Sequence, residues 1–321
     1  MFERYRSEPP SSVTKVTLDR LTDMELESAH AARQRTAFEA HRGRLWGVAY
    51  RMLGSRADAD DMVQEAYLRW HGTPTEQVRT PEAWLVTTTT RLCIDRLRQL
   101  RTEREAYVGP WLPEPLIEEP AAPDVATELA SDLSVAFLAV LERLAPEERA
   151  AFLLHDVFDS DYDEIAAALG KSATACRQIV SRARQRVREE RPRVRMSAAA
   201  RERLVETFMR AIELRDRDAL LEIFAEEATL TSDGGGKARA AHKVVRGGGS
   251  VARYLLGVLR GAQHSLTLQK IAVNGETGIA LRVDGRLVAV MSLLTDGRRI
   301  LGVYSVLNPD KLRSVPAAAP H

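Results

Sequence analysis

The feature that most constrains this chain is a change in the spacing of its apolar residues. Between residues 38 and 104, and again between 128 and 190, apolar side chains recur at intervals of three and four, which predicts amphipathic helices. Further helices are expected over 199–227, and beyond them the interval becomes two. Three turn dipeptides separate the apolar runs there: Asn274-Gly275, Asp284-Gly285 and Asp296-Gly297. The 321-residue chain therefore divides into all-α domains followed by an α+β domain with an antiparallel sheet.

Prolines and polar runs set the expected domain boundaries. Five of the fourteen prolines fall between residues 109 and 123, a density that no regular helix or strand tolerates. Trp111, Leu112 and Leu116 in this stretch favour docking on another surface, with a plain spacer as the alternative. The expected segments are a flexible tail over 1–35, a helical domain over 36–106, an acidic Pro-rich linker over 107–127, a second helical domain over 128–195, an α+β domain over 199–312 and a tail over 313–321.

The net charge of +1 hides a segregation of charge. Residues 128–170 carry 2 basic and 10 acidic side chains, whereas residues 171–195 carry 9 basic and 2 acidic ones. The basic block favours nucleic-acid contact, and the acidic block is expected on the side away from DNA. The chain has no signal-peptide pattern and no apolar run near the ~18 residues that a membrane span needs. We therefore expect a cytoplasmic protein with no membrane contact.

Residues 162–180 have the spacing of a helix-turn-helix. Ile165 and Leu169 are apolar four residues apart, and Gly170 permits the turn between two closely packed helices. Arg and Gln can contact base edges, and further arginines suit phosphates. An ordinary helical hairpin with a basic face is the alternative. The residues expected to contact DNA are Ser172, Thr174, Arg177, Gln178, Ser181, Arg182 and Arg184.

The segment from Asp58 to Glu65 places acidic groups on the exposed side of another predicted helix. Taken alone, this is a solvated surface. Here, however, the chain resembles the extracytoplasmic-function (ECF) sigma factors of the sigma-70 family, over about residues 36–190. The resemblance implies that this helix docks on core RNA polymerase. The polymerase subunits expected to contact the chain are β′ and β. The positions carried over for that contact are Asp61, Gln64 and Glu65.

The stretch from Thr80 to Arg98 resembles the part of these sigma factors that opens the −10 promoter element and holds a flipped base. An aromatic residue beside a basic helix suits single-strand capture by stacking and phosphate contacts. Trp84 is thus either a stacking residue or a core residue. The resemblance assigns the helix-turn-helix to the −35 element, and it implies −10 contacts by Trp84, Thr88, Arg91 and Arg98.

The C-terminal α+β domain resembles the SnoaL-like fold, a curved antiparallel sheet wrapped by helices into a cone with a pocket. Three short stretches match a sigma-J-related group of sigma factors with this fusion. In that group the fused domain is thought to regulate the sigma factor in place of a separate anti-sigma protein. The implied regulatory contacts are Trp111, Leu112, Pro113, Glu114, Pro115, Leu116, Asp233, Gly234, Gly235, Gly236, Lys237, Asn308, Pro309, Asp310, Lys311 and Leu312.

Other functions of the C-terminal domain remain open at this point. Ala238 follows Lys237 where a phosphate-binding P-loop needs Ser or Thr, so no nucleotide site is expected. Asp233, His242 and His264 could supply acid–base groups, although we expect a regulatory domain and not an enzyme. The pocket could hold a small-molecule ligand. No cofactor and no metal are expected, because the seven histidines and two cysteines form no ligand-spaced cluster.

Two alternatives for the whole chain follow from these readings. A ligand-responsive one-component regulator would bind duplex DNA without polymerase, but it would not need the first helical domain. An enzyme with appended DNA-binding helices would instead turn over a small molecule. The sigma-factor reading is the expected one, because both helical domains occur in the order that the family shows.

Overall fold

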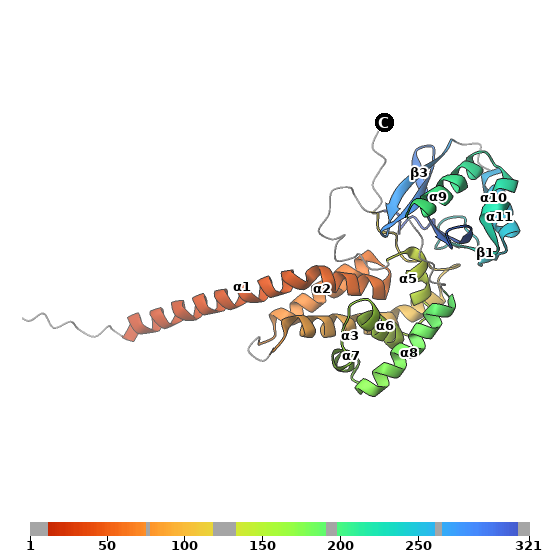
Figure 1. Cartoon of the computed structure of the whole chain (residues 1–321). Helices are drawn as coiled ribbons and strands as arrows, with labels where there is room; N and C mark the ends of the chain where they lie inside the picture. Colours follow the sequence, from red (N-terminus) through yellow and green to blue (C-terminus); the bar gives the residue numbers. More distant parts are fainter. Residues whose placement is uncertain (1–11, 75–77, 118–132, 191–197, 261–264, 314–321) are drawn as a thin grey trace, which may run out of the picture.

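The computed structural model describes residues 12–74, 78–117, 133–190, 198–260 and 265–313. Figure 1 shows a helical half and an α+β domain that lie beside each other, with α1 reaching away from both. The helices of the first half are α1 (Ser12–Leu53), α2 (Arg56–His71), α3 (Pro81–Glu105), α5 (Val135–Leu141), α6 (Pro146–Asp156), α7 (Tyr162–Leu169) and α8 (Ala173–Glu190).

Helices α1, α2 and α3 form the first helical domain around a core that includes Leu45, Trp70 and Leu85. α2 begins after Ser55, whose hydroxyl accepts a hydrogen bond from a first-turn N–H and so caps the helix. α3 begins with Pro81, whose fixed φ suits the first helical turn. Local sequence signals thus set both helix starts.

Helices α5 to α8 form the second helical domain, and α7 with α8 is the predicted helix-turn-helix. Asp161 caps α7 by accepting hydrogen bonds from two N–H groups of its first turn, at 2.9 and 2.8 Å. Gly170 ends α7 with a φ of +63°, which favours glycine. Ser172 then caps α8 by accepting a hydrogen bond from Ala175 N–H at 3.2 Å.

The two helical domains share one continuous apolar core instead of standing apart. Phe158, in the second helical domain, lies against two arginines of α1. Its carbonyl oxygen accepts a hydrogen bond from Arg44 at 2.8 Å, and its ring lies 5.2 Å from the guanidinium of the buried Arg51. This contact fixes the two helical domains in a packed arrangement.

The C-terminal domain contains one sheet with the strand order β2-β1-β6-β5-β4-β3. Its β3 to β6 form the predicted antiparallel meander, and the three turn dipeptides lie at its hairpins, with positive φ at five of their six residues, all but Asp296. Its elements are α9 (Ala198–Glu213), α10 (Arg217–Ile223), β1 (Phe224–Asp233), β2 (Val245–Arg246), α11 (Gly248–Arg260), β3 (Leu266–Val273), β4 (Glu276–Val283), β5 (Arg286–Thr295) and β6 (Ile300–Val306).

The two faces of this sheet have different partners. Met291 of β5 belongs to the core that the sheet forms with α9, α10 and α11. Val290, which precedes Met291 on β5, belongs to a second apolar cluster with Leu112 of the linker and Val135 of α5. Because successive side chains of a strand point to opposite faces, the sheet is covered by its own helices on one side. Its other side is covered by the linker and the second helical domain.

Two expectations about secondary structure were wrong. Residues 12–35 belong to α1 and are not a loose tail, since residues 12–42 contain neither Gly nor Pro. The Gln34 side chain also donates hydrogen bonds to the carbonyl oxygens of Trp70 and Thr73, at 3.2 and 2.9 Å. The helices expected through residue 227 end at Ile223, because β1 pairs in parallel with the distant β6.

Parts of several expected segments lie outside the described residues: 1–11, 118–127 of the linker, 128–132 and 191–195 of the second helical domain, His264, and 314–321 of the C-terminal tail. Within the described part of the chain no helix is long and apolar enough to cross a membrane. The same residues bring together no group of three His, Cys, Asp or Glu side chains that could hold a metal ion.

Candidate DNA and polymerase interfaces and the contact between domains

One face of α2 carries the residues predicted to dock on polymerase. Asp61 and Gln64 are exposed, and the carboxylate of the half-buried Glu65 lies 3.0 Å from the guanidinium of Arg69. Leu68 continues this face and is 57% exposed. Sequence reasoning missed it, although its spacing of three and four residues from the polar set was visible. An exposed apolar side chain beside acidic and amide groups suits a protein–protein contact.

The aromatic residue predicted for the −10 element is part of the first helical domain's packing. Trp84 is half-buried, and its ring centroid lies 5.4 Å from that of the buried Trp70. Thr88, one turn later on α3, is also half-buried. In this arrangement the indole therefore serves the core, and only part of its surface is free for stacking.

The two basic residues predicted for the −10 element are bound by the second helical domain. Arg91 donates hydrogen bonds to the carbonyl oxygens of Ala168 and Ala167, at 3.0 and 2.5 Å. These carbonyls lie at the C-terminal end of α7, where a cation is favoured by the helix dipole. Arg98 forms an ion pair with Glu147 at 3.0 Å. Both arginines thus bind groups of the second helical domain in addition to any contact with solvent.

The outer side of α8 presents most of the residues predicted for the −35 element. The exposed members are Ser172, Thr174, Arg177, Gln178, Ser181 and Arg182. The hydroxyl of Ser172 is already used as the helix cap. Among the described residues Arg182 has no hydrogen-bond or ion-pair partner, which leaves its guanidinium available for a phosphate.

Arg184, which is also predicted to contact DNA, is paired within the second helical domain. Its guanidinium turns back onto the carboxylate of Asp156, with N···O distances of 2.6 to 2.9 Å, and onto the ring of His155. The hydrogen bonds to Asp156 raise the pKa of Arg184. Its position on α8 places it toward α6, so it stabilises the second helical domain instead of presenting a free cation to DNA.

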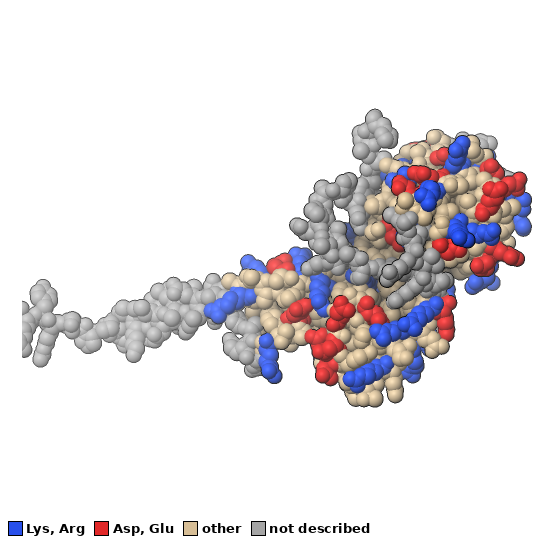
Figure 2. Space-filling model, in the orientation of Figure 1, with Lys and Arg blue, Asp and Glu red and all other residues tan. Residues whose placement is uncertain are grey.

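The acidic and basic blocks of the sequence lie against each other in the second helical domain. On the face drawn in Figure 2, acidic and basic side chains are interspersed over the helical half. The pairs that join the blocks are Lys171 with Glu147 at 3.2 Å, Arg184 with Asp156 at 2.6 Å and Arg186 with Glu148 at 2.6 Å. Acidic groups therefore neutralise the flank of α8, while its outer side stays basic.

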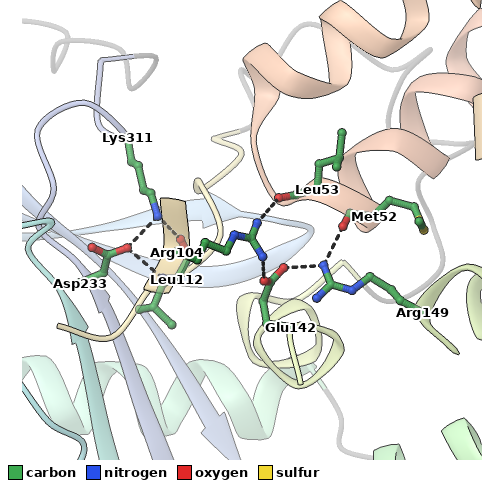
Figure 3. A network of polar contacts seen from close by, with 8 residues as sticks. All are labelled: Met52, Leu53, Arg104, Leu112, Glu142, Arg149, Asp233 and Lys311. Carbon is green, nitrogen blue, oxygen red and sulfur yellow. Dashed lines mark hydrogen bonds and ion pairs between the residues drawn. The ribbon is translucent and has the colours of Figure 1, made fainter. Parts of the chain in front are cut away.

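A buried polar contact links the two helical domains next to the linker. Glu142, in the second helical domain, accepts from Arg149 at 2.6 Å and also pairs with Arg104 of α3. The two arginines also donate to carbonyl oxygens at the end of α1: Arg149 to Met52 at 2.6 Å and Arg104 to Leu53 at 3.0 Å. Burial lowers the pKa of Arg104. Figure 3 shows these contacts beside those that Asp233 and Lys311 of the C-terminal domain make with Leu112.

The described part of the linker is bound to the first helical domain. Glu114 N–H donates to Gly54 O at 2.8 Å, and Tyr50 Oη donates to Glu114 O at 2.6 Å. The Trp111 ring lies so close to Gly54 that an added Cβ would be 2.6 Å from it. Cations lie on the ring of Trp111 as well, with Lys311 at 3.9 Å and Arg104 at 4.0 Å.

The same linker is bound to the C-terminal domain through the fully buried carboxylate of Asp233. It accepts hydrogen bonds from Tyr107 Oη at 2.6 Å, Leu112 N–H at 2.8 Å and Lys311 Nζ at 2.7 Å. Asn308 Nδ2 donates to Tyr107 Oη at 2.9 Å. We call these five residues the Asp233 cluster. Burial lowers the pKa of Lys311, and burial together with the hydrogen bond to Asp233 raises that of Tyr107.

A second linker contact lies at the β3–β4 turn. Asn274 Oδ1 accepts from Leu116 N–H at 2.9 Å, Asn274 N–H donates to Leu116 O at 2.8 Å, and Asn274 Nδ2 donates to Tyr50 Oη at 2.9 Å. Burial raises the pKa of Tyr50. The sequence indicated Asn274 only as a turn residue, and it gave no signal for Tyr50, Tyr107, Glu142 or Arg149.

The remaining predicted regulatory residues surround these contacts. Gly235 passes so close to Asn308 that an added Cβ would lie 2.3 Å from the Asn308 amide, and the exposed Lys237 pairs with Asp310. Pro113, Pro115 and Leu312 are buried at the same boundary, and so is Gly234, which follows Asp233. Gly236, near Val108, and Pro309 are exposed.

Of the acid–base groups considered for catalysis, Asp233 and His242 lie within the described residues, and these two share no hydrogen bond. The Asp233 carboxylate is occupied by the linker, and His242 is exposed.

These domains match known families. The model of sigma-70 region 2 matches residues 37–103, and the model of sigma-70 region 4 matches residues 134–187. The helical half therefore defines a sigma factor of bacterial RNA polymerase, with the first helical domain as region 2 and the second as region 4.

Relatives cover nearly the whole chain. ECF RNA polymerase sigma factor SigJ of Mycobacterium tuberculosis is 38% identical, over 87% of this chain and 93% of its own length. Probable ECF RNA polymerase sigma factor SigI of the same species is 31% identical over 86% and 93%. The crystal structure of SigJ matches with a TM-score of 0.71 at 37% identity, over 88% of this chain and 99% of that one.

The chain belongs to the ECF sigma factors, the family that directs RNA polymerase to specific promoters for transcription initiation. Its C-terminal α+β domain is SnoaL-like, and the helical domains precede it in the expected order.

We expect Asp233→Asn to release the linker. The substitution keeps the size of the side chain but leaves the buried Lys311 ammonium without its counter-ion, which costs about 3–5 kcal/mol of unfolding free energy. Hydrogen–deuterium exchange at Leu112 should become faster, because its N–H loses a carboxylate acceptor. Asp310→Asn is the matched control, since Asp310 pairs at the surface and should change both readouts little. Unchanged exchange at Leu112 in Asp233→Asn would contradict this account.

We expect Arg182→Ala to affect DNA binding and Arg184→Ala to affect stability. Loss of the unpaired Arg182 should weaken binding to −35 duplexes and reduce the slope of log K against log salt by about one. Arg184→Ala should instead lower the melting temperature, because it leaves Asp156 without its partner. Titration of DNA binding against salt measures the slope, and thermal denaturation measures the melting temperature, for both variants. Equal salt slopes for Arg182→Ala and the native chain would show that Arg182 contacts no phosphate.

Proposed function

We propose that this sigma factor is regulated by its own C-terminal domain. The linker and the Asp233 cluster favour a packed arrangement of the two helical domains, which has to open before both promoter elements can be read. The observation that carries the proposal is the fully buried Asp233 carboxylate, which accepts a hydrogen bond from the linker backbone at 2.8 Å. One side chain of the C-terminal domain thus determines where the linker lies.

The packed arrangement competes with DNA at the predicted −10 contacts. Arg91 has fewer N–H groups to offer a phosphate while its Nε and Nη2 donate to the carbonyl oxygens at the end of α7. Arg98 of α3 and Arg182 of α8 line one groove of about 1060 Å³ between the domains. Reading of a −10 and a −35 element requires these side chains to reach separate stretches of DNA, so the groove has to open.

The polymerase-docking face of α2 is not involved in this packing. Asp61 and Gln64 remain exposed, and Leu68 lies beside them. We therefore expect core polymerase to bind the packed form through α2 and to shift the population toward the open form. No separate anti-sigma protein is then required for restraint. We further propose that the protein works in the cytoplasm, where the polymerase is, and that its C-terminal domain is not an enzyme.

The test is run-off transcription with purified core polymerase and a template that carries −35 and −10 elements. The full-length chain should bind the core enzyme and initiate. Replacement of Asp61 by Asn together with Gln64 by Ala should weaken core binding, because both lie on the docking face. The matched control is Glu39→Gln, which removes an exposed carboxylate of α1 outside that face.

A chain that ends at residue 197 tests the regulatory half of the proposal. The apolar core of the helical half contains no residue beyond Ala183, so this chain keeps its whole core. Its transcript yield should differ from that of the full-length protein at equal core binding. Equal yields would rule out autoregulation, and failure of the full-length chain to bind core polymerase would rule out the docking face.

A further inference from the structure

The SnoaL-like domain contains a small apolar cavity between its sheet and the helices α9 and α11. The cavity has a volume of about 70 Å³. Buried side chains from four elements line it: Phe208 of α9, Leu230 of β1, Leu268 of β3 and Met291 of β5. Walls of this kind favour an alkyl group and exclude a charged one from the interior.

Four polar side chains line the cavity, and the hydroxyl of one of them, Ser232, already accepts a hydrogen bond from Ala241 N–H at 3.0 Å. The exposed Arg239, the half-buried Tyr254 and the buried Ser305 can all donate hydrogen bonds. None of the three side chains has a hydrogen-bond or ion-pair partner among the described residues. An unpaired guanidinium with two hydroxyl donors beside an apolar cavity suits a carboxylate whose alkyl chain enters the cavity.

We propose that this cavity binds a short-chain carboxylic acid, with its carboxylate on Arg239 and its alkyl chain among the apolar walls. The volume limits the chain length. A protein cavity of about 150 Å³ admits benzene, and this cavity is roughly half that size. About three or four carbons therefore fit without rearrangement, as in butyrate. A longer acid has to displace Val258, which also lines the cavity and is 51% exposed.

The cavity is directly connected to the linker contact. Ser232 lines the cavity and Asp233 follows it on β1, while Leu307 lines the cavity and Asn308 follows it after β6. Backbone hydrogen bonds of 2.7 and 2.9 Å join Leu307 N–H and Asn308 N–H to Asp233 O. An acid that moves these strand ends changes the geometry of the Asp233 cluster. This regulatory role rests on the proposed autoregulation, whereas binding of the acid does not.

The loop after β1 provides a second connection. It begins at Asp233, passes the close contact between Gly235 and Asn308, and reaches Arg239 at the cavity. A carboxylate that attracts Arg239 therefore pulls on the loop that borders the Asp233 cluster. Because a ligand shifts an equilibrium only by its difference in affinity for the two states, the packed and open forms are expected to bind the acid with different affinities.

The test is calorimetric titration of the full-length protein with sodium butyrate, with 1-butanol and sodium chloride as controls. Butyrate should bind and the two controls should not. Arg239→Gln should weaken butyrate binding by at least about tenfold, because it removes the charge-assisted hydrogen bonds. Arg253→Gln is the matched control, since it removes an exposed arginine of α11 that does not line the cavity. Arg239 is exposed, so its loss should leave the fold intact.

Ala289→Leu provides a second variant, because the larger side chain fills the cavity from β5. It too should abolish butyrate binding. Absence of butyrate binding to the native protein, or equal binding to Arg239→Gln and the native protein, would overturn the proposal. The binding result does not depend on autoregulation. If butyrate binds through Arg239 but removal of the C-terminal domain leaves transcription unchanged, the proposed ligand site is supported and the proposed autoregulation is wrong.

Discussion

The arrangement of this protein depends on one buried carboxylate. Asp233 is fully removed from solvent, and an unpaired charge in that position would be very costly. Its oxygens are satisfied by a tyrosine hydroxyl and a backbone N–H of the linker, at Tyr107 and Leu112, and by the ammonium of Lys311 after β6. A buried ion pair is weak evidence for stability, but it strongly disfavours arrangements in which its partners are absent. The carboxylate therefore selects one position for the linker.

From this fixed linker the contacts continue into both helical domains. Trp111 has the cations of Lys311 and Arg104 on its ring, and Arg104 reaches Glu142 of the second helical domain. Glu114 ties the linker backbone to the end of α1. The C-terminal domain thus contacts the sigma domains through a short segment of chain and through charged side chains that bridge it. Loss of the linker position removes the ring contacts of Trp111, whereas the hydrogen bond from Arg149 to Met52 O and the shared apolar core join the helical domains directly.

Much of the fold could be predicted from local signals. The helix-turn-helix follows from apolar spacing with Gly170 and Ser172, and the meander follows from three turn dipeptides, because each is set within a few residues. The parallel pairing of β1 with β6 could not be predicted, since it joins segments about seventy residues apart and leaves no periodic trace. The same limit applies to the site. The sequence could mark Asp233 and Lys311 through family resemblance, but it could not show that Tyr107 and Asn274 hold the linker.

Arg184 illustrates a further limit, because its residue type suited DNA and only the packing of α8 on α6 shows that it faces Asp156.

The most direct test of the central claim is the distance between the two helical domains in the free protein. Spin labels at Gln99→Cys on α3 and Arg188→Cys on α8 can report it by double electron–electron resonance, since both sites are exposed and the native Cys93 and Cys176 are buried. The account predicts one short, narrow distance in the full-length chain and a longer, broader distribution when Asp233→Asn is added. The same narrow distribution in both proteins would show that the Asp233 cluster does not hold the helical domains together.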